Sequence, residues 1–375
     1  MPAKLAPVIA SIVLGTLRLS AQQPDLSGLI PYTPKVSFAF QTLRIYGGPI
    51  NGLAWAWRAG FLKFHPDTKD IAINVAGGEA AVAGLYTGIS DVGMTGDDVK
   101  IGDLTGFVRM KGHYPMLITG GTGSFDVHHC IPPLAVLVNR ENPLTKVTMK
   151  QLDGIIGSER TGSYAYMPEV KGVNGESFYS DFARGPEKNI RTWGQLGLTG
   201  EWADKEIHTY GPAWGTSVGA FVSHAIVHWS NKVNPNYQEM VSGTKDGPDN
   251  EHVKGILISD VLRRNAKDRY SLGLAHLEDS SKFQELKALA VAANDNGPYY
   301  ELTEQNVRDR KYALLRNVYV VVDREPNYPL EPRTKEFLRY ILSREGQEDC
   351  VKCEYNALTP GEQKKQLAAL DDTGP

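Results

Sequence analysis

Four short segments of the chain share one design: a strand ends, glycine or a small polar residue follows, and a helix begins. They are residues 47–52, 77–80, 95–98 and 215–217. Backbone N–H groups at the start of a helix have no intrahelical partner and carry partial positive charge. Several of them converging on one point would bind an oxyanion without any charged side chain. Any one segment could equally be an ordinary turn, but the four together favour a ligand site.

The fourth segment also matches a catalytic pattern, because residues 215–219 read G-x-S-x-G with Ser217 at the serine position. In serine hydrolases this pattern follows a strand and opens a helix, and an acid and a histidine complete the triad. Asp260 and His276 come later in that order. The pattern is weak in a chain with 38 glycines, and Thr216 as a helix cap explains the same residues. A hydrolase is therefore the less favoured interpretation.

The elements around these segments predict a parallel α/β sheet. Apolar runs indicate strands at residues 43–46, 71–75, 89–94, 115–119, 134–138, 207–210, 272–275 and 314–322. Apolar residues at helical spacing indicate helices at residues 53–64, 80–86, 149–156, 217–229, 253–261 and 337–342. Thr148 with Gln151 forms the sequence signature of a capping box. A repeated order of strand, glycine turn and helix is typical of parallel sheets.

Composition excludes several classes of protein. The 375 residues include 40 Lys and Arg and 43 Asp and Glu, for a formal net charge of −3, and 41% are apolar. These values exclude a disordered chain and one that crosses a membrane many times. A dedicated nucleic-acid binder usually carries a strong basic excess, so we expect no nucleic-acid partner. The length predicts two domains.

The first residues have the features of an export signal. Lys4 supplies a positive charge, residues 5–17 are largely apolar, and Ala21 ends a small-residue pair suited to cleavage. The apolar run is shorter than the roughly 20 residues that span a bilayer. A buried N-terminal helix is the other interpretation. We expect residues 1–21 to be a signal peptide cleaved near Ala21, residues 22–42 to be a linker, and the mature protein to be periplasmic or secreted.

The three cysteines do not form a disulfide framework. Cys350 and Cys353 form a C-x-x-C pair, which is either a local disulfide or two buried thiols. Cys130 follows His128 and His129, but no fourth ligand stands at a recognised metal-site spacing. We therefore expect no metal and no cofactor.

Several segments, taken in chain order, resemble one known family. Residues 134–139, 142–144 and 148–153 are similar to the middle of the phosphate substrate-binding proteins of ABC transporters, which are periplasmic binding proteins. The similarity continues at residues 192–197, 201–202, 210–211, 312–322 and 344–347. The resemblance implies an α/β fold with two lobes, the type II periplasmic-binding-protein fold, and a ligand cleft between the lobes. It also implies a binding protein rather than an enzyme.

The resemblance further implies how the chain is divided and what it does. Residues 43–130 and 316–359 would form a discontinuous first lobe, residues 131–315 the second lobe, and residues 360–375 a polar tail. A monomer would capture a small oxyanion outside the cytoplasm. The ligand would be phosphate by family default, and the protein would hand it to the permease of an ABC transporter.

Nine residues are implied as ligand contacts by the same resemblance. They are Asn51 and Gly52 in the first segment, Gly78 and Glu79 in the second, Thr95 and Asp97 in the third, and Gly215, Thr216 and Ser217 in the fourth. Asp97 would accept a hydrogen bond from protonated phosphate.

The chain departs from the family pattern at two of these places. Pro212 stands where an arginine that clamps the anion is usual, and the charge of Glu79 would oppose a dianion. Arg44, Arg109 and His208 are candidates to compensate. A second interpretation is therefore a relative that no longer binds a ligand and serves as a structural or interaction module.

Overall fold

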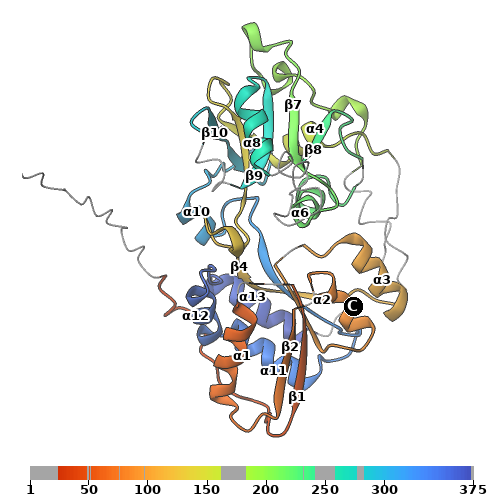
Figure 1. Ribbon diagram of the computed structural model, residues 1–375, viewed down its shortest axis with the longest axis vertical. Coiled ribbons are helices and arrows are strands. Elements are labelled where there is room, and N and C mark those ends of the chain that lie inside the picture. The colour runs from red at the N-terminus through yellow and green to blue at the C-terminus, as the bar shows by residue number, and fades with distance from the viewer. Residues whose placement is uncertain are drawn as a thin grey trace, which may run out of the picture.

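The computed structural model shows two lobes, one above the other in Figure 1, each built around a five-stranded sheet. It describes residues 24–48, 50, 52–75, 77–96, 98–161, 183–230, 232–240, 258–276 and 283–372. The predicted signal peptide lies outside this part of the chain. Among the residues that the structure describes, no helix has both the length and the apolar character needed to cross a membrane.

The first lobe holds a sheet in the order β2-β1-β3-β12-β4. Its strands are β1 (Thr42–Gly47), β2 (Asp70–Asn74), β3 (Val92–Thr95), β4 (Met116–Thr122) and β12 (Asn317–Val322). Strands β1, β2 and β3 run parallel, and β12 is antiparallel to both β3 and β4. Two parts of the chain that are far apart in sequence therefore share this sheet.

Helices cover both faces of the first sheet. On one side lie α1 (Leu53–Phe64), α11 (Pro332–Leu342), α12 (Arg344–Lys352) and α13 (Pro360–Asp371), and on the other α2 (Ala80–Tyr86) and α3 (Ile101–Lys111). The first lobe has one hydrophobic core on each face of its sheet, because successive side chains of a strand point to opposite faces. Val320 and Val322 of β12 are buried on the α1 side, whereas Val321 is buried against α2 and α3.

The second lobe holds a sheet in the order β10-β5-β9-β7-β8. Its strands are β5 (Leu134–Asn139), β7 (His208–Pro212), β8 (Tyr237–Met240), β9 (Ser271–His276) and β10 (Leu286–Ala288). Strands β7, β8 and β9 run parallel, and β5 is antiparallel to β9 and β10. A smaller sheet pairs β6 (Lys146–Thr148) with β11 (Ala290–Ala292).

The helices of the second lobe are α4 (Met149–Ile156), α6 (Ser217–Ala225), α8 (Ile258–Lys267) and α10 (Glu304–Arg308), with short 3-10 helices at Pro186–Lys188, Trp193–Leu196 and Gly200–Trp202. The capping box predicted at the start of α4 is confirmed. Thr148 Oγ1 accepts a hydrogen bond from the Gln151 N–H, and Gln151 Oε1 accepts one from the Thr148 N–H.

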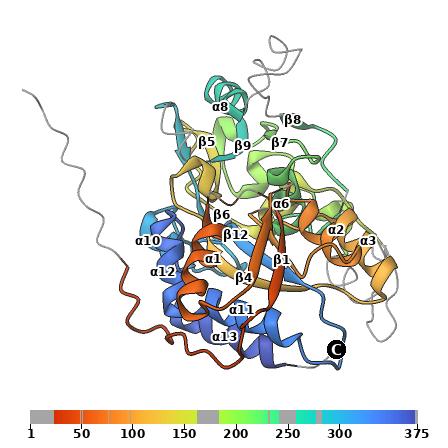
Figure 2. The same cartoon turned by 60° about the horizontal axis from the view of Figure 1, so that its bottom comes forward.

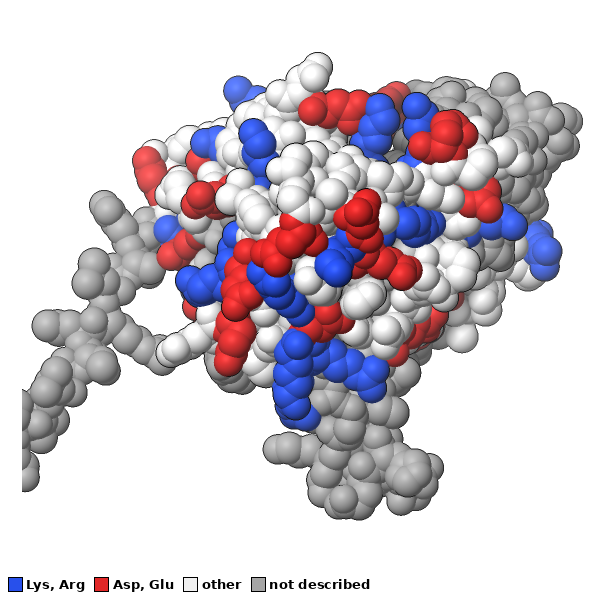
Figure 3. All heavy atoms as spheres, turned by 90° about the horizontal axis from the view of Figure 1, so that it is seen from above, with Lys and Arg blue, Asp and Glu red and all other residues white. Residues whose placement is uncertain are grey.

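Charges of opposite sign are interspersed on the face of the second lobe seen from above (Figure 3). Arg269, for example, lies 2.7 Å from Glu141 and 2.8 Å from Glu201. Such exposed pairs contribute little to stability individually, but they offset one another's charge.

The chain crosses between the lobes twice, along residues 123–133 and 313–316. The Gly123 N–H donates to the Arg316 carbonyl at 2.9 Å and the Leu134 N–H donates to the Leu314 carbonyl at 3.2 Å, so the crossings lie side by side. From sequence, the apolar runs at residues 134–138 and 314–322 are themselves expected to be the two crossings. In the structure β5 lies wholly in the second sheet and β12 in the first, so the crossings are the segments that lead into these strands. Apolar character alone does not separate the two cases, because a strand buried on both faces is as apolar as a crossing segment.

The segments expected to be a linker and a polar tail differ from that expectation, because both pack on the first lobe. Tyr32 and Phe38 are buried in the core that contains α1 and α11, Leu370 of α13 is buried there too, and Leu29 is also buried. Figure 2 shows residues 24–41 running along the outer side of the first lobe. Isolated apolar residues among Pro, Ser and Gly have no period, so sequence patterns do not reveal that each fills a gap in a core.

Tyr32 joins this N-terminal segment to α1 and α11 through buried hydrogen bonds. Its hydroxyl donates to Glu336 Oε1 at 2.7 Å and lies 2.7 Å from His65 Nε2. Because Glu336 takes the hydroxyl proton, His65 Nε2 donates to the Tyr32 oxygen. Burial and the bond to Glu336 raise the pKa of Tyr32 far above its ordinary value, so the hydroxyl stays protonated.

Replacing Tyr32 with phenylalanine should lower the free energy of unfolding by about 1–3 kcal/mol, because Glu336 and His65 each lose a buried partner. Tyr328→Phe is the matched control, since Tyr328 is 60% exposed and its loss should cost less than about 0.5 kcal/mol. Urea unfolding followed by circular dichroism measures both variants. Equal effects would contradict the packed network.

Candidate ligand-binding site

The carboxyl ends of the two sheets face each other across the gap that the crossings span. In the first lobe β3 ends at Thr95 and β4 ends at Thr122 on the same edge. In the second lobe β7 ends at Pro212 and β9 ends at His276 on one edge. The first crossing leaves β4 at Thr122 and enters β5 beside His276, so it joins these two edges. Ligands of open α/β sheets bind beyond such edges, and the candidate site therefore lies between the lobes.

The first three glycine segments of the first lobe come together at this edge. The Gly48 N–H donates to the Met94 carbonyl at 3.0 Å, and the Gly77 N–H donates to the Gly47 carbonyl at 3.1 Å. A Cβ at Gly48 would lie 3.1 Å from the Gly78 Cα, so the first and second segments are in contact. Only glycine fits at position 47, where a Cβ would lie 1.7 Å from the Met94 carbonyl oxygen.

The predicted contacts in these segments fall into two groups. Gly52 precedes α1 in a left-handed conformation, Gly78 precedes α2, and Thr95 is the buried end of β3. The structure brings the segments that carry these three residues together. Asn51 and Asp97 lie outside the described residues.

The fourth segment caps α6 of the second lobe. Thr216 Oγ1 accepts from the Gly219 N–H at 3.0 Å and donates to the Ala213 carbonyl at 2.7 Å, so this hydroxyl is used within the segment. Gly215 lies in the turn before it. Among the described residues, the N–H groups of Ser217 and Val218 have no partner. They form the first helical turn and point away from the helix toward whatever lies beyond its start.

Ser217 makes no hydrogen bond to a histidine within the described part of the chain. The contact that would support a serine hydrolase is therefore not found there, and the helix-cap interpretation explains the segment.

Helix α6 also reaches across to the first lobe. His224 Nδ1 lies 3.3 Å from Asp98 Oδ2, and Asp98 is the buried last residue of the third glycine segment. Trp229, in the turn after α6, packs against the cluster formed by α2 and α3. These contacts bring the third and fourth segments to the same interlobe region. Asp98 lies in a segment singled out from sequence, but its pairing with His224 and the packing of Trp229 are not predicted there, because these contacts join positions far apart in the chain.

The cations proposed from sequence to replace the missing arginine are placed elsewhere. Arg44 binds Asp91 at 2.7 Å, His208 binds Asp268 at 2.7 Å, and Arg109 is exposed on α3. A different cation, Arg316, is buried in the second crossing.

The guanidinium of Arg316 lies between elements of the second lobe that border the candidate site. It is 5.9 Å from the centre of the Phe221 ring on α6, and Nη1 lies 3.5 Å from His276 Nε2 at the end of β9. In the sequence, the feature that could have drawn attention to Arg316 is its position as the single charged residue inside the apolar run at 314–322.

Glu79 is paired with a cation. Lys100 Nζ lies 2.6 Å from Glu79 Oε1, and the Glu79 side chain is 64% exposed. The hydrogen bond from Lys100 lowers the pKa of Glu79 below its ordinary value. The carboxylate therefore stays ionised at neutral pH, but its charge is offset by a neighbouring ammonium group.

The cysteines are thiols rather than disulfides. Cys130 and Cys350 are buried and Cys353 is partly buried. Burial raises the pKa of Cys350 and of Cys353 above the ordinary value of a thiol. Of the two alternatives for the C-x-x-C pair, the structure has the thiols.

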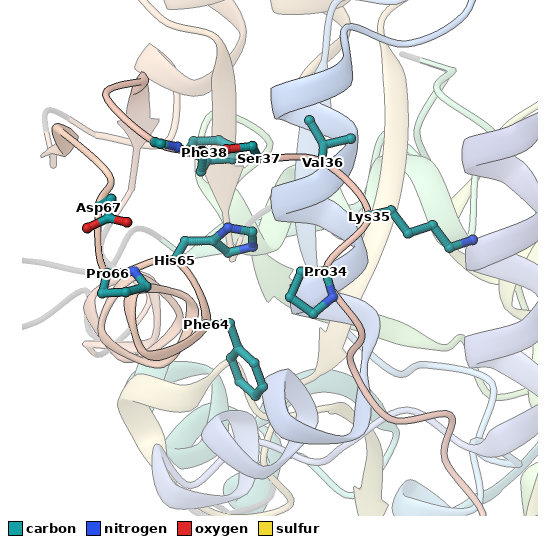
Figure 4. Close-up of a pocket in the computed structure, with 10 residues that line it drawn as sticks. Pro34, Lys35, Val36, Ser37, Phe38, Phe64, His65, Pro66 and Asp67 are labelled. Carbon is teal, nitrogen blue, oxygen red and sulfur yellow. Dashed lines mark hydrogen bonds between the residues drawn. The ribbon is translucent and has the colours of Figure 1, made fainter.

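A pocket of about 330 Å³ lies at the opposite end of the first lobe, lined by residues 34–39 and 64–67 (Figure 4). It borders the C-terminal end of α1 and the turn before β2. This is the amino-terminal edge of the parallel strands, so the pocket is separate from the interlobe site.

Two α/β lobes with facing carboxyl edges and a double crossing define a two-lobed periplasmic binding protein. A sequence model of the PBP superfamily domain matches residues 49–345, and the chain belongs to this superfamily. The fold expected from sequence is therefore confirmed.

The chain is also similar to individual proteins. It is 25% identical over 322 residues to the phosphate-binding protein PstS of Pseudomonas aeruginosa, covering 86% of this chain and 84% of the relative. Among solved structures, PstS from Borrelia burgdorferi gives a TM-score of 0.49 at 16% identity, covering 85% of this chain and 99% of that one. An ABC-type phosphate transport receptor from Vibrio cholerae gives 0.47 at 16% identity, with 84% and 100% covered.

The turn that follows α6 should make stability depend on pH. Burial lowers the pKa of His228 from 6.5 to about 4, so the folded state resists a proton that the unfolded state binds. Stability should fall as the pH drops from about 6.5 to about 4. The loss should stay below roughly 3 kcal/mol at 1.36 kcal/mol per unit, because solvent screens the partly exposed ring. Asparagine tolerates the left-handed backbone at this position (φ 55°), so His228→Asn should remove this part of the loss.

Urea unfolding of both proteins at several pH values measures the difference between them, which cancels the titration of the carboxylates. Parallel curves for the wild type and His228→Asn would show that the histidine does not contribute.

Proposed function

We propose that the protein captures inorganic phosphate between its lobes and delivers it to the permease of an ABC transporter. The observation that carries this proposal is the meeting of glycine segments from both sheets at the interlobe edge, bridged by Asp98 and His224. The similarity to phosphate-binding proteins over most of both chains supports phosphate as the ligand.

The binding site would rely on backbone groups and one buried cation. The N–H groups of Ser217 and Val218 at the start of α6 and those of the segments at Gly52 and Gly78 would donate to the phosphate oxygens. Hydrogen bonds to a charged group contribute about 1.5–3 kcal/mol each, so several of them can hold an anion. Thr95, Gly215, Thr216 and Ser217 would shape the walls, and Asn51 and Asp97 would complete the set.

Arg316 would take the part of the arginine that is replaced by Pro212. Arg316 is buried in the second crossing, beside α6, and the removal of water there strengthens the attraction between its guanidinium and an anion. Its position in a crossing, rather than on a lobe, would couple the ligand to the relative placement of the lobes.

No covalent step is involved in this function. Phosphate would shift the population from an open to a closed arrangement, because only the closed arrangement brings groups of both lobes to the ligand. A permease that favours the open arrangement would then release it.

We propose that residues 43–130 and 316–359 belong to the first lobe and residues 131–315 to the second. The two hydrophobic cores support this division, with Ile131 at the boundary packing in the first core. Residues 24–42 and 360–372 extend the first lobe. The mature protein would begin near residue 22, act as a monomer outside the cytoplasm, and require no cofactor.

Calorimetry on ligand-free mature protein tests the proposal, with phosphate as the probe and sulfate and molybdate for comparison. Phosphate should bind at one site per chain and more tightly than sulfate. No measurable binding of any of the three would favour a relative that serves as an interaction module.

Arg316→Met should weaken phosphate binding by roughly 10- to 100-fold, because one charge-assisted contact is lost. Arg44→Met is the matched control, since Arg44 binds Asp91 in the same lobe and should leave the affinity unchanged. Circular dichroism checks that both variants are folded. An unchanged affinity in folded Arg316→Met would remove this arginine from the site.

Glu79→Gln should strengthen phosphate binding by a few fold at low salt, because it leaves the Lys100 ammonium without its counter-charge. Lys100→Gln should act in the opposite direction. Lys150→Gln is the control, because Lys150 pairs with Asp295 at 2.6 Å in the second lobe. The same calorimetric titration applies, and a weaker affinity in Glu79→Gln would indicate that this carboxylate supports the site.

A further inference from the structure

Three side chains of the types that ligate metals meet beside the first crossing, outside the proposed phosphate site. A nitrogen of His129, the Cys130 sulfur and a carboxylate oxygen of Glu354 all lie within 4.8 Å of one another. His129 and Cys130 belong to the short 3-10 helix His128–Cys130, and Glu354 follows α12. This cluster cannot be recognised from sequence spacing, because Glu354 is far from His129 and Cys130 along the chain.

The backbone around the cluster is held by several hydrogen bonds. Thr122 and Asn356 exchange two backbone bonds of 2.9 Å, and Asn356 Nδ2 donates to the Gly123 carbonyl at 2.7 Å. The Cys130 thiol donates to the Cys353 carbonyl at 3.6 Å. These bonds bring the start of the crossing against the turn that carries Glu354.

Two residues at the cluster hold an unfavourable backbone conformation. Glu354 has a φ of 66° and Ile131, directly after Cys130, has a φ of 58°. A left-handed residue other than glycine costs about 1–2 kcal/mol and persists only where its surroundings enforce it. The surrounding packing therefore fixes the turns on which the ligating residues stand.

We propose that His129, Cys130 and Glu354 bind one zinc ion, with a water molecule in the fourth position. Imidazole nitrogen, thiolate sulfur and carboxylate oxygen are the three donor types that zinc accepts, and three protein ligands leave one tetrahedral position open. Magnesium and calcium prefer oxygen ligands only. The negative charges of one thiolate and one carboxylate balance the two charges of the ion.

The burial of the three residues suits an ion that enters from solvent. Cys130 is fully buried, whereas His129 and Glu354 are exposed. Tetrahedral zinc places a sulfur and a nitrogen ligand about 3.5 Å apart, given bonds of about 2.3 and 2.0 Å. The two exposed side chains can close the remaining distance of roughly 1 Å by rotation while the sulfur stays in place.

Zinc binding by the full mature protein tests this site, with thiols kept reduced and phosphate absent. Calorimetry with zinc chloride should give one site per chain, and magnesium chloride should give none. His129→Ala and Glu354→Gln should each weaken zinc binding at least about 100-fold, beyond the roughly 10- to 100-fold loss that removal of an outer-sphere partner causes. Glu325→Gln, an exposed acid of the same lobe, is the matched control and should bind zinc as the wild type does.

Cobalt(II) reports the sulfur ligand directly. The wild type should show thiolate-to-cobalt charge-transfer absorption in the near ultraviolet, and Cys130→Ala should lose it. His129→Ala and Glu354→Gln keep the test decisive if Cys130→Ala does not fold. The proposal is overturned if the reduced wild type binds no zinc, if both surface variants bind as tightly as the wild type, or if mass spectrometry finds Cys130 in a disulfide in the purified protein.

Discussion

The architecture depends on the pairing of the two chain crossings. The Gly123 N–H donates to the Arg316 carbonyl and the Leu134 N–H donates to the Leu314 carbonyl, so the first crossing contacts the second near both of its ends. Only glycine fits at position 123, where a Cβ would lie 1.8 Å from the Ile131 carbonyl oxygen. Because the crossings connect the carboxyl edge of one sheet to that of the other, the turns that follow β3 and β7 face the opposite lobe. The placement of the candidate site follows from that geometry.

The electrostatics of the interlobe region favour an anion held largely by dipoles. Pro212 removes the arginine that is usual in the family, and Glu79 adds a carboxylate, yet Lys100 offsets that carboxylate and Arg316 supplies a buried guanidinium. In the proposed site, the cation that contacts the anion would lie in a crossing rather than on a lobe. The charge used for binding would then be attached to the segment that connects the two lobes.

Local patterns predicted local structure well and long-range contacts poorly. The helix at Ala80–Tyr86 and the capping box at Thr148 depend on neighbouring residues, and both appear as expected. Tyr32 was assigned to a linker because its burial depends on Glu336, which lies in another part of the chain. The proposed roles of Arg316 and Glu354 are not predicted from sequence for the same reason. Each role depends on contacts with residues that are distant in the chain and are brought close only by the fold. The spacing of residues along the chain does not indicate which distant residues will be in contact.

The hinge can be located from the cores that its neighbours enter. Ile131 is buried in the core of the first lobe and Leu134 in that of the second, which leaves Pro132 and Pro133 as the bending part of the first crossing. Proline fixes φ at each, so rotation is confined to few backbone angles. In the second crossing Leu314 enters the second core and Val318 the first, which leaves Arg316 between them. A hinge of this kind, with two prolines in one crossing and the proposed anion-binding arginine in the other, would allow closure along a restricted path. An anion bound at Arg316 would then act directly on the backbone angles through which the lobes move.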